Sequence, residues 1–327
     1  MPSPALDSQR TILVTGGAGF IGSHLVERLL AEGKNVVVID DCSTGSLDNL
    51  RTVQGHPRLR VIESKISASA GLSDLVSQAD WVFHLAAAVG VELVVNSPVR
   101  TLQTNLHETE VILEAASRRQ VPVLLTSTSE VYGKSQKDAL SETDDLLIGP
   151  PHVGRWSYAC SKLMDEFLAL AYFNEKGLPI IIARLFNTVG PRQTGRYGMV
   201  LPRFIAAAKT GQPLRVYGDG IQTRCFCYVR DTVEALLRLQ GCPNARGQVF
   251  NVGSTEEISI QGLAQRVVQT LGSKSAIQLV LYAKAYPAGF EDMQRRRPAL
   301  AKLEAATGFR ATTPLQTMIE LTAQSFL

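Results

Sequence analysis

A tyrosine and a lysine stand four residues apart in the segment SYACSKLMDEF, as Tyr158 and Lys162. Four residues are close to one helical turn, so both side chains project from the same face of a predicted helix. A phenol with a pKa of about 10 is a weak base at neutral pH, and a nearby ammonium lowers that pKa. The pair is therefore predicted to take a proton from a hydroxyl group while a hydride leaves the carbon that carries this hydroxyl.

Three polar residues follow the apolar run VPVLL, namely Thr128, Ser129 and Glu130 within TSTSEVYG. The run predicts a buried strand, and the carboxyl ends of parallel strands are where such sheets bind ligands. Two hydroxyls and a carboxylate can donate, accept or position a proton. We predict that these three residues share in catalysis with Tyr158 and Lys162, although Glu130 could also be a structural acceptor at the strand end.

A glycine loop lies near the amino terminus, in TGGAGFIG. Gly17, Gly19 and Gly22 have the G-x-G-x-x-G spacing, and Gly16 precedes them. The loop follows the predicted strand TILVT and opens the predicted helix SHLVERLLAEG, which is the context that a dinucleotide site requires. Glycines allow a tight turn and a close approach of the backbone to a pyrophosphate, which the helix amino terminus attracts.

Asp40 ends the next predicted strand, NVVVID, 18 positions after Gly22. A carboxylate there accepts hydrogen bonds from ribose hydroxyls and repels a 2′-phosphate, so it favours NAD over NADP. The following DDCSTGS contains no arginine. The predicted cofactor-binding residues are Gly16, Gly19, Phe20, Ile21, Gly22, Asp40, Asp41, Ser43, Thr44, Gly45, Leu85, Ala86, Ala87, Asn105, Tyr158 and Lys162.

The elements that must position these residues alternate along the chain. Apolar strands are expected in WVFHLAA, VPVLLTS and LPIIIARLF, and amphipathic helices in TNLHETEVILEAASRRQ and SYACSKLMDEFLALAYFNEKG. This alternation predicts an α/β protein with a Rossmann-type, doubly wound parallel sheet. After residue 186 the regular alternation of strands and helices ends, and we expect a smaller, interleaved α+β substrate-binding lobe over 187–327. Residues 1–186 form the predicted NAD-binding domain, and 229–254 return to it.

Composition narrows the classes of partner. The 327 residues carry a net charge of only +3 with the two signs mixed, so nucleic acid is not expected as a partner. The five cysteines have no spacing typical of a metal site or a disulfide framework, which favours a reducing cytoplasm. MPSPALDSQR lacks an apolar signal core, and no apolar stretch reaches membrane-spanning length. We expect a cytoplasmic protein without metal or membrane partners.

Seven motifs together resemble the extended short-chain dehydrogenase/reductase family of nucleotide-sugar epimerases, dehydratases and decarboxylases. They are TGGAGFIGSHL, HLAA, STSEVYG, YACSK, RLFNTVGPRQ, VYGDGIQTRCFCYV and VFNVGS, and the resemblance covers nearly the whole chain. It implies a tightly bound, recycled NAD, with Tyr158 as base, Lys162 as its electrostatic helper and Thr128 as hydroxyl partner. It also implies a homodimer, for which the helices TNLHETEVILEAASRR and SYACSKLMDEFLALAY could supply a four-helix interface.

The resemblance further implies contacts with a UDP-sugar substrate. Asn187 would touch the sugar diphosphate, Tyr217 could stack on uracil, and arginines would clamp the phosphates with forked hydrogen bonds. The implied substrate-binding residues are Asn187, Arg192, Val200, Arg203, Tyr217, Gln222, Arg224 and Arg296. One position departs from the family: VIESKIS places Lys65 where an acidic residue near the adenine is usual, and Glu63 is a neighbouring substitute.

The triplet Thr128-Ser129-Glu130 bears on the reaction. These enzymes begin by oxidising C4 of a hexose, and Thr-Ser-Glu resembles the UDP-glucuronate decarboxylases. A C4 ketone makes the glucuronate carboxylate part of a β-keto acid, which loses carbon dioxide and leads to UDP-xylose. Ser129 cannot replace the strong acid of the 4,6-dehydratases. The segment PAGFEDMQRRRP is expected to be a polar loop. Its part GFEDMQRRRP, which contains Arg296, also resembles the decarboxylases.

Three other functions remain open on the sequence. A 4-epimerase acting on UDP-glucuronate or UDP-glucose shares the fold, the cofactor and the first step. A GDP-mannose 4,6-dehydratase has a similar triplet, but that family favours NADP, against which Asp40 argues. A non-catalytic NAD-sensing protein is disfavoured because Tyr158 and Lys162 are both present.

Overall fold

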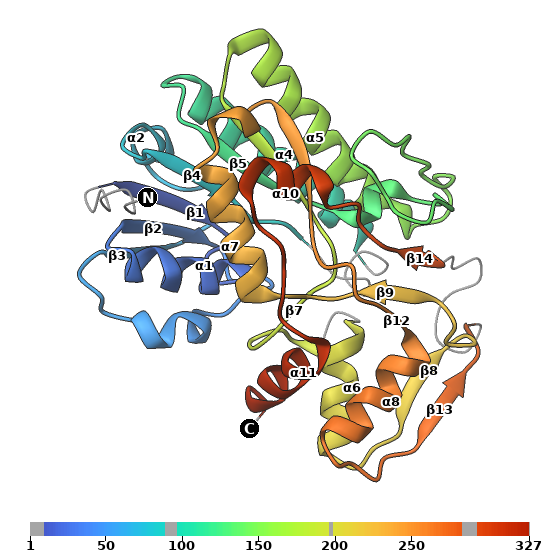
Figure 1. The fold of residues 1–327 in the computed structure, drawn as a ribbon. Helices are drawn as coiled ribbons and strands as arrows, with labels where there is room; N and C mark the ends of the chain where they lie inside the picture. The colour runs from blue at the N-terminus through green and yellow to red at the C-terminus, as the bar shows by residue number, and fades with distance from the viewer. Residues whose placement is uncertain (1–9, 89–96, 196–198, 283–292, 327) are drawn as a thin grey trace.

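The computed structural model describes residues 10–88, 97–195, 199–282 and 293–326. Figure 1 shows a large sheet with helices on both faces and a smaller lobe below it, built mostly from the later part of the chain. The predicted α/β class, with a doubly wound parallel sheet and a smaller carboxyl-terminal lobe, is confirmed. The exact division into domains stays a prediction.

The large sheet has seven strands in the order β11-β6-β5-β4-β1-β2-β3, and every neighbouring pair is parallel. The strands are β1 (Thr11–Thr15), β2 (Asn35–Asp40), β3 (Leu59–Glu63), β4 (Trp81–His84), β5 (Val123–Thr128), β6 (Ile180–Leu185) and β11 (Gln248–Val252). The direction of winding reverses between β1 and β4. Ligands of such sheets bind outside the carboxyl ends of the strands at this switch point.

Helices form one layer on each face of the sheet (Figure 1). One layer holds α1 (Phe20–Ala31), α7 (Val229–Gln240) and α10 (Ala301–Thr307), with short 3-10 turns η1 (Leu47–Val53) and η4 (Pro243–Ala245) beside it. The other holds α2 (Leu72–Ser77), α4 (Pro98–Ser117) and α5 (Trp156–Lys176). Because successive strand side chains alternate between faces, Ile12 and Val14 join the first core and Leu13 joins the second.

The smaller lobe packs three helices around a separate apolar core. They are α6 (Val200–Lys209), α8 (Ile260–Thr270) and α11 (Leu315–Gln324), beside the parallel pair β8 (Leu214–Tyr217) and β13 (Ile277–Val280). Two small sheets lie near the boundary with the large sheet: β7 (Thr188–Val189) with β10 (Cys227–Tyr228), and β12 (Glu257–Ser259), β9 (Thr223–Cys225) and β14 (Arg295–Arg296).

Strand β14 corrects one expectation. PAGFEDMQRRRP was predicted as a polar loop, but within its described part Arg295 and Arg296 pair in parallel with Thr223 and Arg224 of β9. Arginine is uncommon in buried strands. The strand that β14 pairs with is distant in sequence, so local residues could not predict this pairing. The pairing fixes Arg296 in the small β12-β9-β14 sheet, and its side chain is buried rather than solvated.

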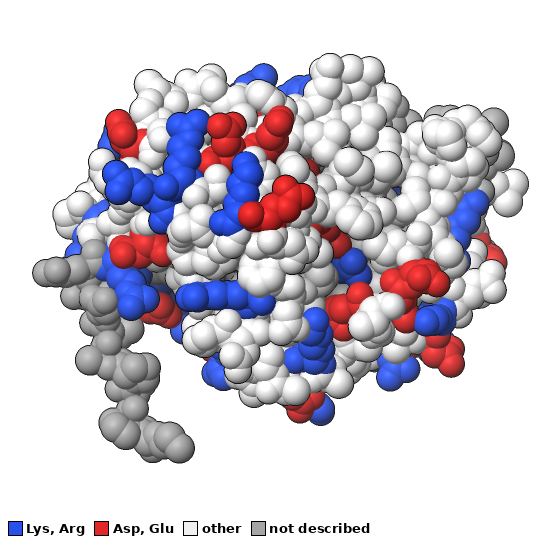
Figure 2. All heavy atoms as spheres, turned by 90° about the horizontal axis from the view of Figure 1, so that it is seen from above, with Lys and Arg blue, Asp and Glu red and all other residues white. Residues whose placement is uncertain are grey.

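On the face that Figure 2 shows, basic and acidic side chains are interspersed. Within the described residues, none of the helices has the length and apolar content that crossing a bilayer requires. The same residues contain no cluster of three or more His, Cys, Asp or Glu side chains arranged to bind a metal ion.

Candidate active site

The glycine loop connects β1 to α1 and brings the backbone close to the end of β4. Gly16 has a φ of 72°, and a Cβ there would lie 2.7 Å from the backbone nitrogen of Ala86. A Cβ at Gly22 would lie 2.1 Å from the Gly16 carbonyl oxygen, so only glycine fits at this position in the first turn of α1. The helix amino terminus therefore opens directly into the cleft, which suits a pyrophosphate.

Asp40 lies at the carboxyl end of β2, 8% exposed. Its Oδ2 accepts a hydrogen bond from the Ala18 backbone N–H at 2.8 Å, and its Oδ1 accepts one from Cys42 at 2.9 Å. Burial raises the pKa of its carboxyl, while these backbone donors oppose the rise. The carboxylate thus ties the glycine loop to β2 and also faces the cleft, where a ribose would lie.

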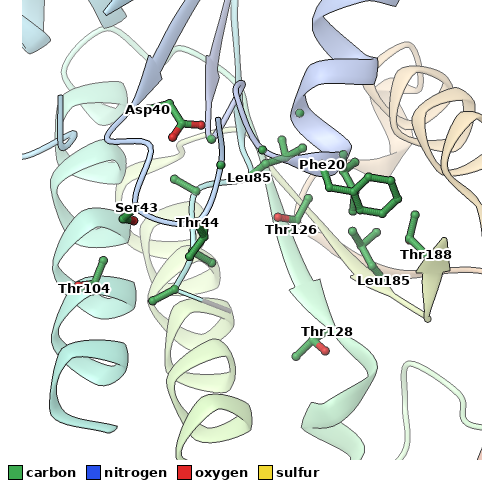
Figure 3. Close-up of a pocket in the computed structure, with 18 of the residues that line it drawn as sticks. Phe20, Asp40, Ser43, Thr44, Leu85, Thr104, Thr126, Thr128, Leu185 and Thr188 are labelled. Atoms are coloured by element: carbon green, nitrogen blue, oxygen red, sulfur yellow. The ribbon is translucent and has the colours of Figure 1, made fainter. Parts of the chain in front are cut away.

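A cleft of about 560 Å³ runs along the carboxyl edge of the sheet. Figure 3 places Thr128 where β5 ends, with Asp40, Ser43 and Thr44 farther along the cleft. The predicted site residues that line it are Gly16, Gly19, Phe20, Ile21, Gly22, Asp40, Asp41, Ser43, Thr44, Gly45, Leu85, Ala86, Ala87, Thr128, Ser129, Glu130, Tyr158, Lys162, Asn187, Arg192 and Arg296. One cavity therefore joins the predicted cofactor site to the predicted catalytic residues.

Asn105 does not line this cleft. Its Oδ1 accepts a hydrogen bond from the Ala88 backbone N–H at 2.7 Å, and its Nδ2 donates to Ser161 Oγ at 3.1 Å. The side chain thus links the segment after β4 to α5, and its effect on a cofactor would pass through that segment. Sequence position alone could not separate this supporting role from a direct contact.

The substrate-binding residues predicted in the smaller lobe also lie outside the lining of the cleft. They are Val200, Arg203, Tyr217, Gln222 and Arg224. Several contact one another: the Arg203 guanidinium lies 4.4 Å from the centre of the Tyr217 ring, and Gln222 Nε2 donates to the Tyr217 carbonyl at 3.0 Å. Their roles toward a substrate stay predictions.

The sequence-based search missed residues on two segments that line the cleft. Thr104 and Glu108 come from α4, and Gln193, Thr194 and Met199 follow β7. The motif RLFNTVGPRQ includes Gln193 and was the available signal for the second group. Thr104 and Glu108 had none, because their place depends on how α4 packs against the sheet.

Lys65, the departure from the family pattern, lines the same cleft together with Ser64 and Ile66. The suggested substitute, Glu63, is not among the lining residues. The acidic side chain that approaches this part of the cleft is Glu108, whose Oε2 accepts the Ser67 backbone N–H at 2.8 Å. Both oxygens of this carboxylate accept hydrogen bonds from Ser67, so Glu108 ties α4 to the segment after β3.

Beyond β5 the chain turns sharply in η2 (Ser129–Tyr132), and Thr128 caps this turn by accepting the Glu130 N–H at 3.2 Å. The turn directs Glu130 toward two buried arginines. Arg296 Nη2 lies 3.3 Å from Glu130 Oε1, and Arg155 Nη1 lies 3.9 Å from Glu130 Oε2. Arg155 was not predicted; it precedes α5 and its guanidinium lies 5.5 Å from the Trp156 ring centre.

Tyr158 and Lys162 lie on one face of α5, and both line the cleft. Lys162 Nζ donates to Asp165 Oδ2 at 2.8 Å within the buried base of the site. In this geometry the pKa of Tyr158 is raised, chiefly by burial and then by the negative charges of Glu130 and Asp165, while hydrogen bonding to Thr128 lowers it. The direction is opposite to the expectation from the sequence, because burial and the two nearby carboxylates outweigh the groups that lower this pKa.

A Rossmann-type fold, a glycine cradle, a carboxylate after β2 and a Tyr–Lys pair in the same cleft define a dinucleotide-dependent enzyme of the short-chain dehydrogenase/reductase type. The model of the NAD dependent epimerase/dehydratase family matches residues 12–253, and the chain belongs to that family. The cofactor of the family is NAD, and the cleft fits it: the loop allows close backbone approach, and Asp40 suits an unphosphorylated ribose.

Characterised relatives match nearly the whole chain. The UDP-N-acetyl-alpha-D-glucosaminuronate decarboxylase of Bacillus cytotoxicus is 41% identical over 97% of this chain and 98% of its own length. UDP-glucuronic acid decarboxylase 6 of Arabidopsis thaliana is 36% identical over 100% of this chain and 93% of its own. Among solved structures, a UDP-glucuronic acid 4-epimerase from Bacillus cereus, in complex with UDP-glucuronic acid and NAD, superposes with a TM-score of 0.86 at 28% identity, covering 96% and 98% of the two chains.

Proposed function

We propose that this protein decarboxylates a UDP-linked hexuronic acid through a transient 4-keto sugar. UDP-glucuronate, which would give UDP-xylose, is the substrate expected from the sequence. Its 2-acetamido counterpart is the second candidate, favoured by the relative from Bacillus cytotoxicus. The observation that carries the proposal is the meeting of Tyr158, Glu130 and Arg296 in one cleft beside the glycine cradle.

The first step assigned to the protein is proton removal from the C4 hydroxyl by Tyr158, with Thr128 hydrogen-bonded to the phenol. NAD, when bound, supplies the hydride acceptor for this oxidation and the donor for the later reduction. Lys162 holds a positive charge at the base of the cleft. The glycine loop and Asp40 hold the dinucleotide in place.

With C4 oxidised, the C5 carboxylate lies β to a ketone and leaves as carbon dioxide, and its electron pair passes into an enolate. A donor must then protonate C5, and we assign this to a water molecule held by Ser129 and Glu130. Ser129 is 1% exposed and lines the cleft, and Arg296 orients the Glu130 carboxylate at 3.3 Å. Tyr158 finally returns its proton to the C4 oxygen as the ketone is reduced.

The reaction can be identified directly by incubating the purified protein with UDP-glucuronate and, separately, with UDP-N-acetylglucosaminuronate, and following both by proton NMR. A UDP-pentose and one equivalent of carbon dioxide are expected with one of them. UDP-galacturonate from the first, with no carbon dioxide, would replace the proposal by 4-epimerisation, which the structural similarity to the Bacillus cereus epimerase favours. Bound NAD without turnover of either sugar would favour the hypothesis of a non-catalytic NAD-sensing protein.

Two finer expectations belong to the same proposal. A cytoplasmic location suits the five free cysteines, of which Cys225 and Cys227 have pKa values raised to about 12 by burial and so remain protonated thiols. A homodimer through α4 and α5 suits the large apolar side chains exposed on these helices.

A further inference from the structure

Lys162 has a buried acidic partner, Asp165, one turn further along α5. Its ammonium Nζ lies 2.8 Å from Asp165 Oδ2, and the two side chains are 2% and 0% exposed. Residues three apart share a helix face, so the pair lies beneath the cleft as a unit. Removing one partner of such a pair leaves an uncompensated buried charge, which is strongly unfavourable.

We propose that Asp165 is a positioning residue that fixes the Lys162 ammonium at the buried base of the cleft and offsets part of its electrostatic field at Tyr158. The inference rests on the proposed function, because it concerns the same acid–base pair. It adds a third member to that pair, and this member touches neither the sugar nor the cofactor. Asp165 does not line the cleft.

Other charged groups face this trio from the elements packed against it. Glu130 on η2 raises the proton affinity of Tyr158, and Arg296 on β14 lowers it. Burial raises the pKa of Asp165, Lys162 and Thr109 lower it, and Glu166, the next residue of α5, raises it further. Glu130 and Arg296 contact each other at 3.3 Å, so their effects at Tyr158 partly cancel.

The wall behind the pair is polar but carries no charge at neutral pH. His84 of β4 lies between Thr15 and Thr109, with its Nδ1 2.8 Å from Thr15 Oγ1 and its Nε2 3.1 Å from Thr109 Oγ1. Burial lowers the pKa of His84 to about 3, so the ring is neutral. Among the described groups in this region, the negative charge in contact with Lys162 is therefore that of Asp165.

Weakening the Lys162 field by a nearby carboxylate is useful in a reaction in which one phenol first accepts and later donates a proton. Tyr158 must lose a proton to accept that of the sugar hydroxyl, and must later return it to the ketone oxygen. A fully exerted ammonium field favours the first transfer at the expense of the second. The Asp165 carboxylate shifts the balance toward return of the proton and so toward completion of the cycle.

The decisive measurement is the ionisation of Tyr158 in the NAD-loaded protein without sugar. Tyrosines labelled with carbon-13 at Cζ are titrated by NMR, and the Tyr158 signal is assigned with Tyr158→Phe. In Asp165→Asn, a change of nearly equal size, Tyr158 is expected to ionise at a pH lower by about one unit, the usual effect of removing one nearby negative charge. The acid limb of the kcat/KM profile should move in the same direction.

Glu175→Gln is the matched control, because it removes one carboxylate from an exposed position of the same helix and should leave the Tyr158 titration in place. An unchanged or upward shift in Asp165→Asn overturns the inference. If that variant does not fold, Asp165→Ser, which is neutral and smaller, is titrated with the same expected direction. Failure to turn over either uronate would refute the proposed function but would leave the titration result readable.

Discussion

Replacing Tyr158 is expected to impair the catalytic step without impairing NAD binding. Tyr158→Phe removes only the hydroxyl that exchanges the proton, so turnover should fall by about 10²–10⁴-fold while NAD remains bound. Tyr172→Phe is the natural control, because Tyr172 and Lys176 repeat the same spacing on α5, with the ammonium 4.3 Å from the ring centre, outside the cleft. Steady-state rates and the absorbance of released NAD distinguish the variants; equal rates would remove Tyr158 from the mechanism.

Glu130 is expected to act after oxidation rather than in it. Glu130→Gln keeps the size of the side chain but weakens its hold on a protonating water and its ion pair with Arg296. Decarboxylation should slow by at least about tenfold, the lower range for loss of a positioned proton-transfer group. NADH absorbance at 340 nm in single turnovers should still show C4 oxidation. Decarboxylation at the wild-type rate would leave Glu130 with a structural role only.

His84 is a structural histidine whose burial couples stability to pH. Its pKa falls from an ordinary value near 6.5 to about 3 in the folded protein, so the unfolded chain binds an extra proton between these values. Stability is therefore present above pH 6.5 and is lost as the pH falls, by about 1.4 kcal/mol per unit from this group. Urea unfolding at pH 7, 6 and 5 should show a shallower dependence for His84→Gln; parallel curves would contradict this.

At the scale of elements, an ion pair ties α5 to the sheet. Glu166 accepts Arg184 Nη2 at 2.7 Å and Nε at 3.0 Å, and it also accepts the Ser127 hydroxyl. The two charged side chains are 4% and 5% exposed. Glu166→Gln should cost about 3–5 kcal/mol, because a buried guanidinium loses its counter-ion.

The matched double variant tests whether this cost comes from the unpaired charge. Glu166→Gln with Arg184→Met removes both charges, so its free energy of unfolding should lie closer to the wild type than the sum of the single changes predicts. Chemical denaturation of the four proteins measures the coupling. Strict additivity would mean that the pair contributes only through packing.

Local patterns were enough for the central strands of the large sheet and for most of the cofactor site. The β1–α1–β2 unit and the loop at Gly16 are encoded within 30 consecutive residues, so periodicity and glycine spacing identify them. The residues that reach the catalytic end from elsewhere were harder. Arg155 and Glu108 carry no motif, and their place depends on packing between helices and sheet.

The rise in the pKa of Tyr158 could not be predicted from the sequence, although Asp165 lies only three residues after Lys162. Spacing shows that Asp165 shares a helix face with Lys162, but it does not show whether that face is buried. Burial decides whether the two charges pair or are screened by water. In the folded protein both are buried, and the ammonium points to the carboxylate.

At the scale of the whole molecule, the site lies where two independently packed cores meet. The glycine loop belongs to the large sheet, while Arg192 and Met199 reach the cleft from the chain that leads into the smaller lobe. Arg192 is anchored to α1, since its Nη1 donates to Ser23 Oγ at 3.2 Å and it pairs with Glu27. The lobe is thereby held against the first helix of the cofactor domain.

The exposed face of α5 leads to the prediction for assembly. Met164 and Phe167 are 50% and 64% exposed and three residues apart, so they form one apolar surface, and α4 packs alongside with Val99 66% exposed. Large exposed apolar side chains on adjacent helices are typical of a subunit interface. Light scattering is expected to give a dimer for the wild type and a monomer for Phe167→Glu with an unchanged circular dichroism spectrum. Ile221→Glu, which changes an equally exposed apolar residue between β8 and β9, should leave the dimer intact; a monomeric wild type, or dimers in all three proteins, would exclude this interface.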